Sequence, residues 1–66
     1  MTELDKKFDV GDHVKAKNDL IFDATRIPAG TPGVVMKVFP ITSSYRVRFF
    51  GFPSEQRVYE SEIEKA

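Results

Sequence analysis

The chain has 66 residues, which is the size of one small domain. Its 41% hydrophobic and 30% charged residues are typical of a globular protein, and ten Lys plus Arg balance ten Asp plus Glu, which excludes nucleic-acid binding by bulk charge alone. The lack of cysteine excludes disulfides, thiolate metal sites and a cysteine nucleophile, and a single histidine excludes a histidine-rich zinc site.

The N-terminal part predicts a tail, a turn and a first strand. Residues 1–7 are polar and mixed in charge, so we expect a flexible tail followed by one domain over residues 8–66. Gly11 and Asp12 form a turn signal, because glycine tolerates positive φ and aspartate bonds to nearby backbone. Residues 13–17 alternate between apolar and polar side chains, which is typical of a strand with one buried face.

Residues 20–32 predict a long connection that ends in a dense run of Pro and Gly and whose apolar residues fold back on the domain. Residues 34–39 follow as the strand with the strongest β-propensity. Strict alternation places Lys37 on one face, leaves Val35 as a misfit, and puts three apolar side chains together on the other face: Val34, Met36 and Val38.

The C-terminal part predicts two more strands and a short terminal helical turn. Residues 44–50 alternate clearly, with Tyr45, Val47 and Phe49 on the apolar face. Residues 55–59 form a short last strand. Ser61 is then the expected cap of one helical turn, in which Ile63 plugs the core.

These elements predict an all-β fold. Four to five short strands with tight turns must bury their apolar faces and remove their edges, so we expect a small SH3-like antiparallel barrel. The alternative is a flat three-stranded meander that dimerises to cover its apolar face.

The motif order resembles SH3-like small barrels over roughly residues 8–64. The motifs are Gly11-Asp12-x-Val14-x-x-Lys17, Gly30-x-x-Gly33-x-Val35-x-x-Val38, Tyr45-x-Val47-x-Phe49, Val58 and Glu62-Ile63. The two central glycines look like a KOW motif, which implies nucleic-acid binding. The long 20–32 insertion is more similar to the electron-transport accessory group, which includes the photosystem I E subunit and the nitrile hydratase beta barrel. That resemblance implies an accessory subunit of a larger complex.

The basic residues gather in the body of the chain. Between residues 13 and 59 seven basic residues face only three acidic ones, while both ends of the chain are acidic. Alternation points the basic side chains outward, and we expect them to form one partner-binding face with two exposed aromatic residues. The candidate residues are Lys15, Lys17, Lys37, Arg46, Arg48, Arg57, Tyr59 and Phe50.

The sequence predicts no catalytic residues, cofactor or metal site, because His13 has no nucleophile or second histidine at a suitable spacing. We expect a non-catalytic module, monomeric or weakly dimeric, that docks on an acidic protein surface. A KOW-like nucleic-acid binder is the alternative. A tetramer that resembles plasmid-type dihydrofolate reductase is a lesser alternative. In that family a Val-Gln-Ile-Tyr segment and a lysine after the Gly-Asp turn line the pore. Here Gln56 is displaced within Gln56-Arg57-Val58-Tyr59, and Ala16 stands at the position of the lysine.

The sequence also predicts where the protein works. Residues 1–7 are not followed by the apolar segment of an export signal, and no apolar run approaches the length needed to cross a bilayer. We therefore expect a cytoplasmic protein with no membrane partner.

Overall fold

The computed structural model describes residues 7–23 and 25–66, and over these residues the chain is all-β. The elements are β1 (His13–Ala16), β2 (Leu20–Phe22), β3 (Thr25–Ile27), β4 (Pro32–Phe39), η1 (Pro40–Thr42), β5 (Ser44–Phe49), β6 (Glu55–Tyr59), η2 (Glu60–Glu62) and β7 (Ile63–Lys65). All but Lys7 of the tail expected over residues 1–7 lies outside the described residues. The backbone N–H of Lys7 itself donates to Tyr45 Oη at 2.9 Å.

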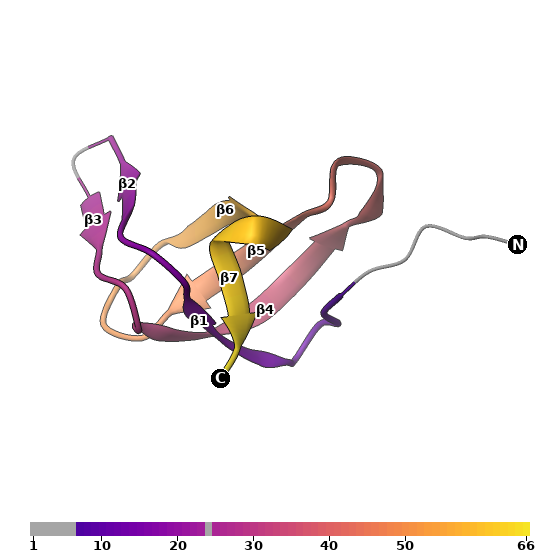
Figure 1. Ribbon diagram of the computed structural model, residues 1–66, viewed down its shortest axis with the longest axis horizontal. Helices are drawn as coiled ribbons and strands as arrows, with labels where there is room; N and C mark the ends of the chain where they lie inside the picture. Colours follow the sequence, from indigo (N-terminus) through magenta and orange to yellow (C-terminus); the bar gives the residue numbers. More distant parts are fainter. Residues whose placement is uncertain (1–6, 24) are drawn as a thin grey trace, which may run out of the picture.

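The described strands form two antiparallel sheets (Figure 1). The larger sheet has the strand order β6-β5-β4-β1-β7, and β2 pairs with β3 in a separate hairpin. Strands β4, β5 and β6 are a simple meander, while β1 joins the other edge of β4. The prediction of an all-β antiparallel fold is therefore confirmed.

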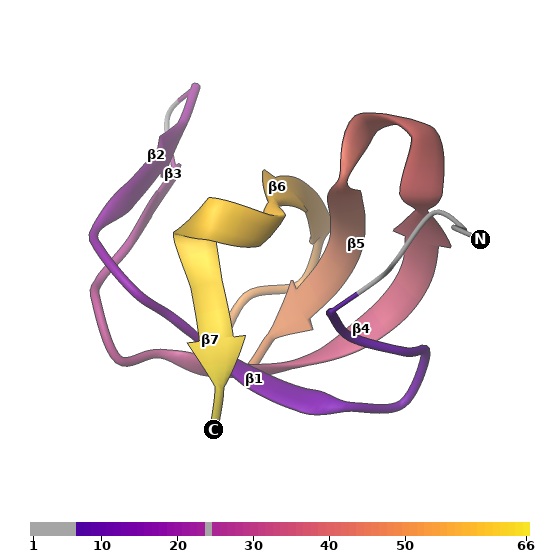
Figure 2. The same ribbon diagram turned by 45° about the vertical axis from the view of Figure 1, so that its right-hand side comes forward.

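The larger sheet is curled but is not closed into a barrel. Strands β6 and β7 are its two edges, yet only the three residues of η2 separate them along the chain. A 3-10 helix rises about 2 Å per residue, so the end of β6 and the start of β7 lie one short turn apart. Figure 2 shows η2 leading from β6 to β7, which crosses toward β1. The expected closure fails because the ladder of paired strands ends at β6 and at β7.

Residues 20–32 were expected to be a loop, and this expectation was wrong in part. They contain the β2–β3 hairpin, in which Leu20 pairs with Ile27 and Phe22 with Thr25. Leu20 and Ile27 are buried in the core, as expected for a segment that folds back on the domain. A three-residue strand gives too short an alternation to be separated from an irregular apolar run.

The predicted facing of residues 34–39 was wrong for Val35 and Met36. Val35 is fully buried, whereas Met36 is 42% exposed. The cause is a β-bulge: Val35 pairs with Val47, but the next pair joins Lys37 to Arg46, so Met36 is an extra residue. The bulge shifts the alternation by one, and Val38 consequently returns to pack against the core.

The other predicted strands are confirmed, and they supply the core. In β5 the alternation is as expected, with Tyr45, Val47 and Phe49 buried and Arg46 and Arg48 exposed. The core also takes residues from β1, the hairpin, β4, β6 and the chain ends: Phe8, Val14, Ala16, Leu20, Ile27, Val35, Val58 and Ile63. The rings of Phe8 and Tyr45 meet edge to face, with centroids 5.3 Å apart.

The expected terminal helical turn exists, but Ser61 is not its cap. The turn is η2, and Tyr59 precedes it with its backbone N–H donating to Glu62 Oε1 at 2.8 Å. Ile63 is buried as predicted and opens β7, a strand that the sequence did not indicate. Within the described residues, no helix is long and apolar enough to cross a bilayer.

Candidate functional site

Three cations stand in a row across the outer face of the β6-β5-β4 meander. The strand register places Arg46 of β5 directly opposite Lys37 of β4 on one side and Arg57 of β6 on the other. With strands about 4.8 Å apart, the row spans about 10 Å. We call these three residues the cationic row.

The ring of Phe39 brings the cationic row together. Arg57 Cζ lies 4.6 Å from the ring centroid, Lys37 Nζ 5.5 Å and Arg46 Cζ 5.7 Å. Each distance is within the range in which an aromatic ring attracts a cation. Phe39 takes this position because it lies two residues beyond Lys37 on the same face of β4.

A small hydroxyl network fixes Arg57 at the end of the row. Its Nε donates to Ser44 Oγ and its terminal nitrogen to Thr42 Oγ1, both at 3.2 Å. The two hydroxyls are themselves 2.7 Å apart, and Ser44 is fully buried. The 3-10 turn η1 and the left-handed Ser43, with φ of 54°, place Thr42 beside β5. A guanidinium held by two hydrogen bonds is preorganised to donate further hydrogen bonds to an anion.

Carboxylates only partly offset the charge of this face. Glu55 forms an ion pair with Arg46 at 3.8 Å, although Arg48 is its cross-strand partner. Among residues 7–23 and 25–66, Lys37, Arg48 and Arg57 form no ion pair. Four cations therefore share three strands with one carboxylate.

Two predicted site residues lie elsewhere. Lys15 pairs with Pro32, which is five residues from Lys37 along β4, or about 16 Å at the usual rise per residue. Its ammonium forms an ion pair with Glu64 of β7 at 3.8 Å. Lys17 follows β1, and its backbone N–H donates to the carbonyl of Glu62. Neither lysine joins the cationic row.

The two predicted aromatic residues flank the row. Tyr59 is 56% exposed and lies two residues beyond Arg57 on β6, opposite Ser44. Phe50 is 54% exposed and follows β5 on the same alternation as Arg46 and Arg48. Phe50 borders a groove of about 640 Å³ together with Arg48, Val34, Met36, Phe52 and Pro53.

Sequence reasoning missed Phe39, Ser44 and Thr42. Phe39 had a usable signal, because the spacing Lys37-x-Phe39 puts a cation and a ring on one face of a strand. The hydroxyl pair had none, since it depends on the conformation of η1. Met36 was assigned to the core because no residue type marks a bulge of this kind.

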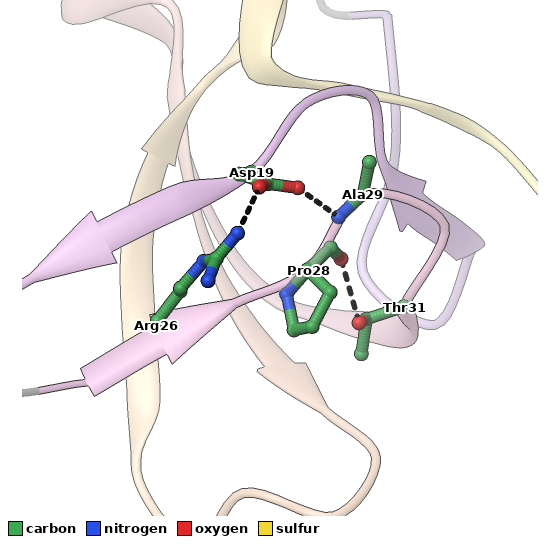
Figure 3. A network of polar contacts seen from close by, with 5 residues as sticks. All are labelled: Asp19, Arg26, Pro28, Ala29 and Thr31. Carbon is green, nitrogen blue, oxygen red and sulfur yellow. Dashed lines mark hydrogen bonds and ion pairs between the residues drawn. The ribbon is translucent and has the colours of Figure 1, made fainter.

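A second polar network, around Asp19, has a structural role (Figure 3). Asp19 accepts from Arg26 at 2.6 Å and from the Ala29 N–H at 2.8 Å, and so joins the β2–β3 hairpin to the turn after it. The Arg26 guanidinium and the Ala29 N–H hold the pKa of the Asp19 carboxyl below its usual range. Thr31 Oγ1 donates to the Pro28 carbonyl at 2.7 Å and tightens the same turn. Arg26 is thereby occupied within the hairpin.

No group of three or more His, Asp or Glu side chains in the described part of the chain is placed to hold a metal ion. In comparisons with known proteins, the chain matches no family model, no curated protein and no solved structure. The resemblance to SH3-like and KOW domains therefore stays a prediction. What the chain binds must be inferred from the cationic row and its surroundings.

Proposed function

We propose that this protein is a non-catalytic binding module whose cationic row docks on an acidic surface of a larger protein. The observation that supports this proposal is the register of the row. Arg46 stands directly opposite Lys37 and Arg57, so three like charges are cross-strand neighbours on one face.

Like charges that face each other across strands destabilise a sheet, by about 0.2–1 kcal/mol for each pair. The Phe39 ring and the single carboxylate of Glu55 offset part of this cost. A carboxylate-bearing partner would remove the rest, so docking relieves repulsion that the free protein carries. Because such contacts act at long range, they would speed association and weaken as salt rises.

A protein partner fits the face better than a nucleic acid does. The row is only about 10 Å long, the chain as a whole has no net charge, and an apolar groove adjoins Arg48. The nucleic-acid alternative has one observation in its favour: the exposed ring of Tyr59 lies beside Arg57, where a base could stack. The experiment below distinguishes the two partners.

The curl of the larger sheet supports an SH3-like barrel as the finer description of the fold, because the three residues of η2 join its two edges. With the sequence resemblance to electron-transport accessory proteins, this fold suggests a cytoplasmic accessory subunit of a redox or metal enzyme. The lesser alternative, an enzyme formed by assembly of four chains, requires a stable tetramer. Light scattering that shows a monomer or a weak dimer would support the non-catalytic binding module over the tetrameric enzyme.

The direct test is an amide NMR titration of the full chain. The probes are a glutamate-rich peptide and a single-stranded RNA of equal charge, each at about 20 mM and about 300 mM NaCl. We expect the peptide to shift the amides of Lys37, Arg46 and Arg57, and to bind at least tenfold more weakly at the higher salt.

Variants complete the test. The double variant Lys37→Gln with Arg57→Gln should lose peptide binding. The matched control Lys15→Gln, with Lys17→Gln, removes the same charge outside the row and should bind like the wild type. RNA that binds more tightly than the peptide, with shifts centred on Tyr59, would contradict the proposal in favour of the nucleic-acid alternative. Equal losses in the two double variants would also contradict it, since binding would then follow net charge alone.

A further inference from the structure

We infer that the groove beside the cationic row holds an apolar side chain of the same partner, and that the partner segment is extended, with acidic residues at alternate positions. In outline the segment is apolar-x-acid-x-acid. This inference rests on the proposed function for its acidic positions and adds the apolar anchor, the spacing and the role of Arg48.

The groove is large enough to take an apolar side chain, and most of its lining residues are apolar. Its volume of about 640 Å³ falls in the range of small-ligand pockets. Val34 lines it from β4, while Phe50, Phe52 and Pro53 line it from the turn between β5 and β6. Phe52 also packs against the core, so this side of the groove is anchored to the domain.

Met36 is the extra residue of the β-bulge, and it lines the groove. Strict alternation from Val35 would turn the side chain of residue 36 outward and that of residue 38 outward as well. The bulge keeps Met36 exposed on the groove side but returns Val38 to the core. Met36 and Lys37 are consequently exposed side by side along β4. Methionine is flexible and polarisable, which suits a surface that must adapt to a partner side chain.

Arg48 gives the groove its charge preference. Its neighbours across the strands are Val34 and Glu55, but the Glu55 carboxylate pairs with Arg46. Within the described residues Arg48 makes no ion pair. Arg48 is exposed at the edge of these apolar residues, and its guanidinium can form two parallel hydrogen bonds with a carboxylate brought beside it. The occupant must therefore carry an acid next to its apolar anchor.

The alternation of β5 gives the spacing. Arg46, Arg48 and then Phe50 follow each other at two-residue steps on one face, about 6.7 Å apart. An extended peptide has the same repeat between alternate side chains. A peptide that runs along β5 would place two acids on Arg46 and Arg48 and its apolar residue in the groove beside Phe50.

The test compares two peptides on the full chain. One contains Leu-Ser-Glu-Ser-Glu and the other contains Ser-Ser-Glu-Ser-Glu. Each peptide is also made with its sequence reversed, which tests binding in the opposite direction along β5. Because burying a leucine side chain is strongly favourable, the leucine peptide should bind at least tenfold more tightly in one direction. Amide shifts should extend from Arg46 and Arg48 to Phe50 and Phe52.

Two substitutions test whether the groove causes the advantage of the leucine peptide. Phe50→Ser changes an exposed side chain and should remove the tenfold advantage while leaving the salt-dependent binding of the serine peptide. Ile21→Ser removes an apolar side chain of the β2–β3 hairpin that is more exposed than Phe50, and it should change neither the advantage of the leucine peptide nor the binding of the serine peptide. Equal affinities for the two peptides, or an advantage that survives Phe50→Ser, would overturn the groove inference alone.

Failure of both peptides to bind would overturn the proposed function. RNA that binds more tightly than either peptide and shifts Phe50 would replace the peptide occupant with a stacked base.

Discussion

The outer face of the larger sheet has two parts, which differ in whether their cations are paired with carboxylates. On β1 and β7, Lys15 meets Glu64 and Lys65 meets Asp12, so each of these lysines has an opposite charge within 4 Å. On β4, β5 and β6, the cationic row sets like charges opposite one another. The first part uses charge to support strand pairing. The second part carries charge at a cost to stability, which is the pattern expected where a surface is shaped for binding.

Strand β4, which joins the two parts of the sheet, gives the largest predicted effect. Gly33 on β4 pairs with Val14 of β1 and with Phe49 of β5. A Cβ added at Gly33 would lie 2.8 Å from the Arg48 carbonyl oxygen and 2.9 Å from a methyl of Val47. Because backbone and core atoms are in the way, Gly33→Ala should destabilise the domain by about 3 kcal/mol, or roughly 15 °C in Tm. Urea and thermal unfolding measure this loss.

A second glycine serves as the control. Gly51 has open space around the added Cβ but a φ of +90°, so Gly51→Ala introduces backbone strain without a clash. We expect a loss of about 1 kcal/mol from that strain. If the two variants lose the same stability, the close approach at Gly33 is not what joins the two parts of the sheet.

Acid should first affect the regions in which carboxylates are paired, which are the β2–β3 hairpin and the β1–β7 part of the larger sheet. The folded-state pKa of Asp19 is lowered by Arg26 and the Ala29 N–H, and that of Asp12 by the Asp9 N–H and Lys65. A lowered folded-state pKa means that the contribution to stability is fully present above the unfolded value of about 3.9. It is lost as the pH falls through the folded-state pKa.

The variant Asp19→Asn isolates the hairpin contribution. It should unfold at lower urea than the wild type at pH 7, and the difference should shrink steadily below about pH 4. Asp23→Asn on the same hairpin leaves the Asp19 network intact and should follow the wild type throughout. A difference that stays constant down to pH 2 would show that the Asp19 carboxylate is not the group that titrates.

Regular alternation made much of the fold predictable. Strands β5 and β6 agree with the sequence because buried and exposed residues alternate from Tyr45 to Phe49 and along β6, and β1 agrees over four of its five predicted residues. The reading failed where local geometry breaks the period: the bulge at Met36, the three-residue strands of the hairpin, and β7 directly after η2. These features depend on tertiary contacts, which a single sequence does not display.

The sequence predicted which side chains of the candidate site point outward, but not which of them lie together. Alternation correctly turned Lys37, Arg46, Arg48 and Arg57 outward, because an arginine or lysine on a half-buried strand avoids the core. It could not show which outward residues are neighbours, since that depends on strand order and register. Lys15 shares the outward direction, but its place opposite Pro32 separates it from the cationic row.

The smallest predicted effect compares the two parts of the face most directly, through charge reversal of one lysine in each. Lys15→Glu would face Glu64 and should destabilise the domain by about 0.5 kcal/mol, whereas Lys37→Glu would face Arg46 and should stabilise it by a similar amount. Urea unfolding at about 20 mM NaCl should show the opposite signs, and about 1 M NaCl should suppress both. Lys37→Glu should at the same time lose affinity for the glutamate-rich peptide. A gain in stability that accompanies a loss of binding is the result expected if the row is kept for a partner. If Lys37→Glu destabilises the domain as much as Lys15→Glu does, the row is not under repulsion and the main support for docking is lost.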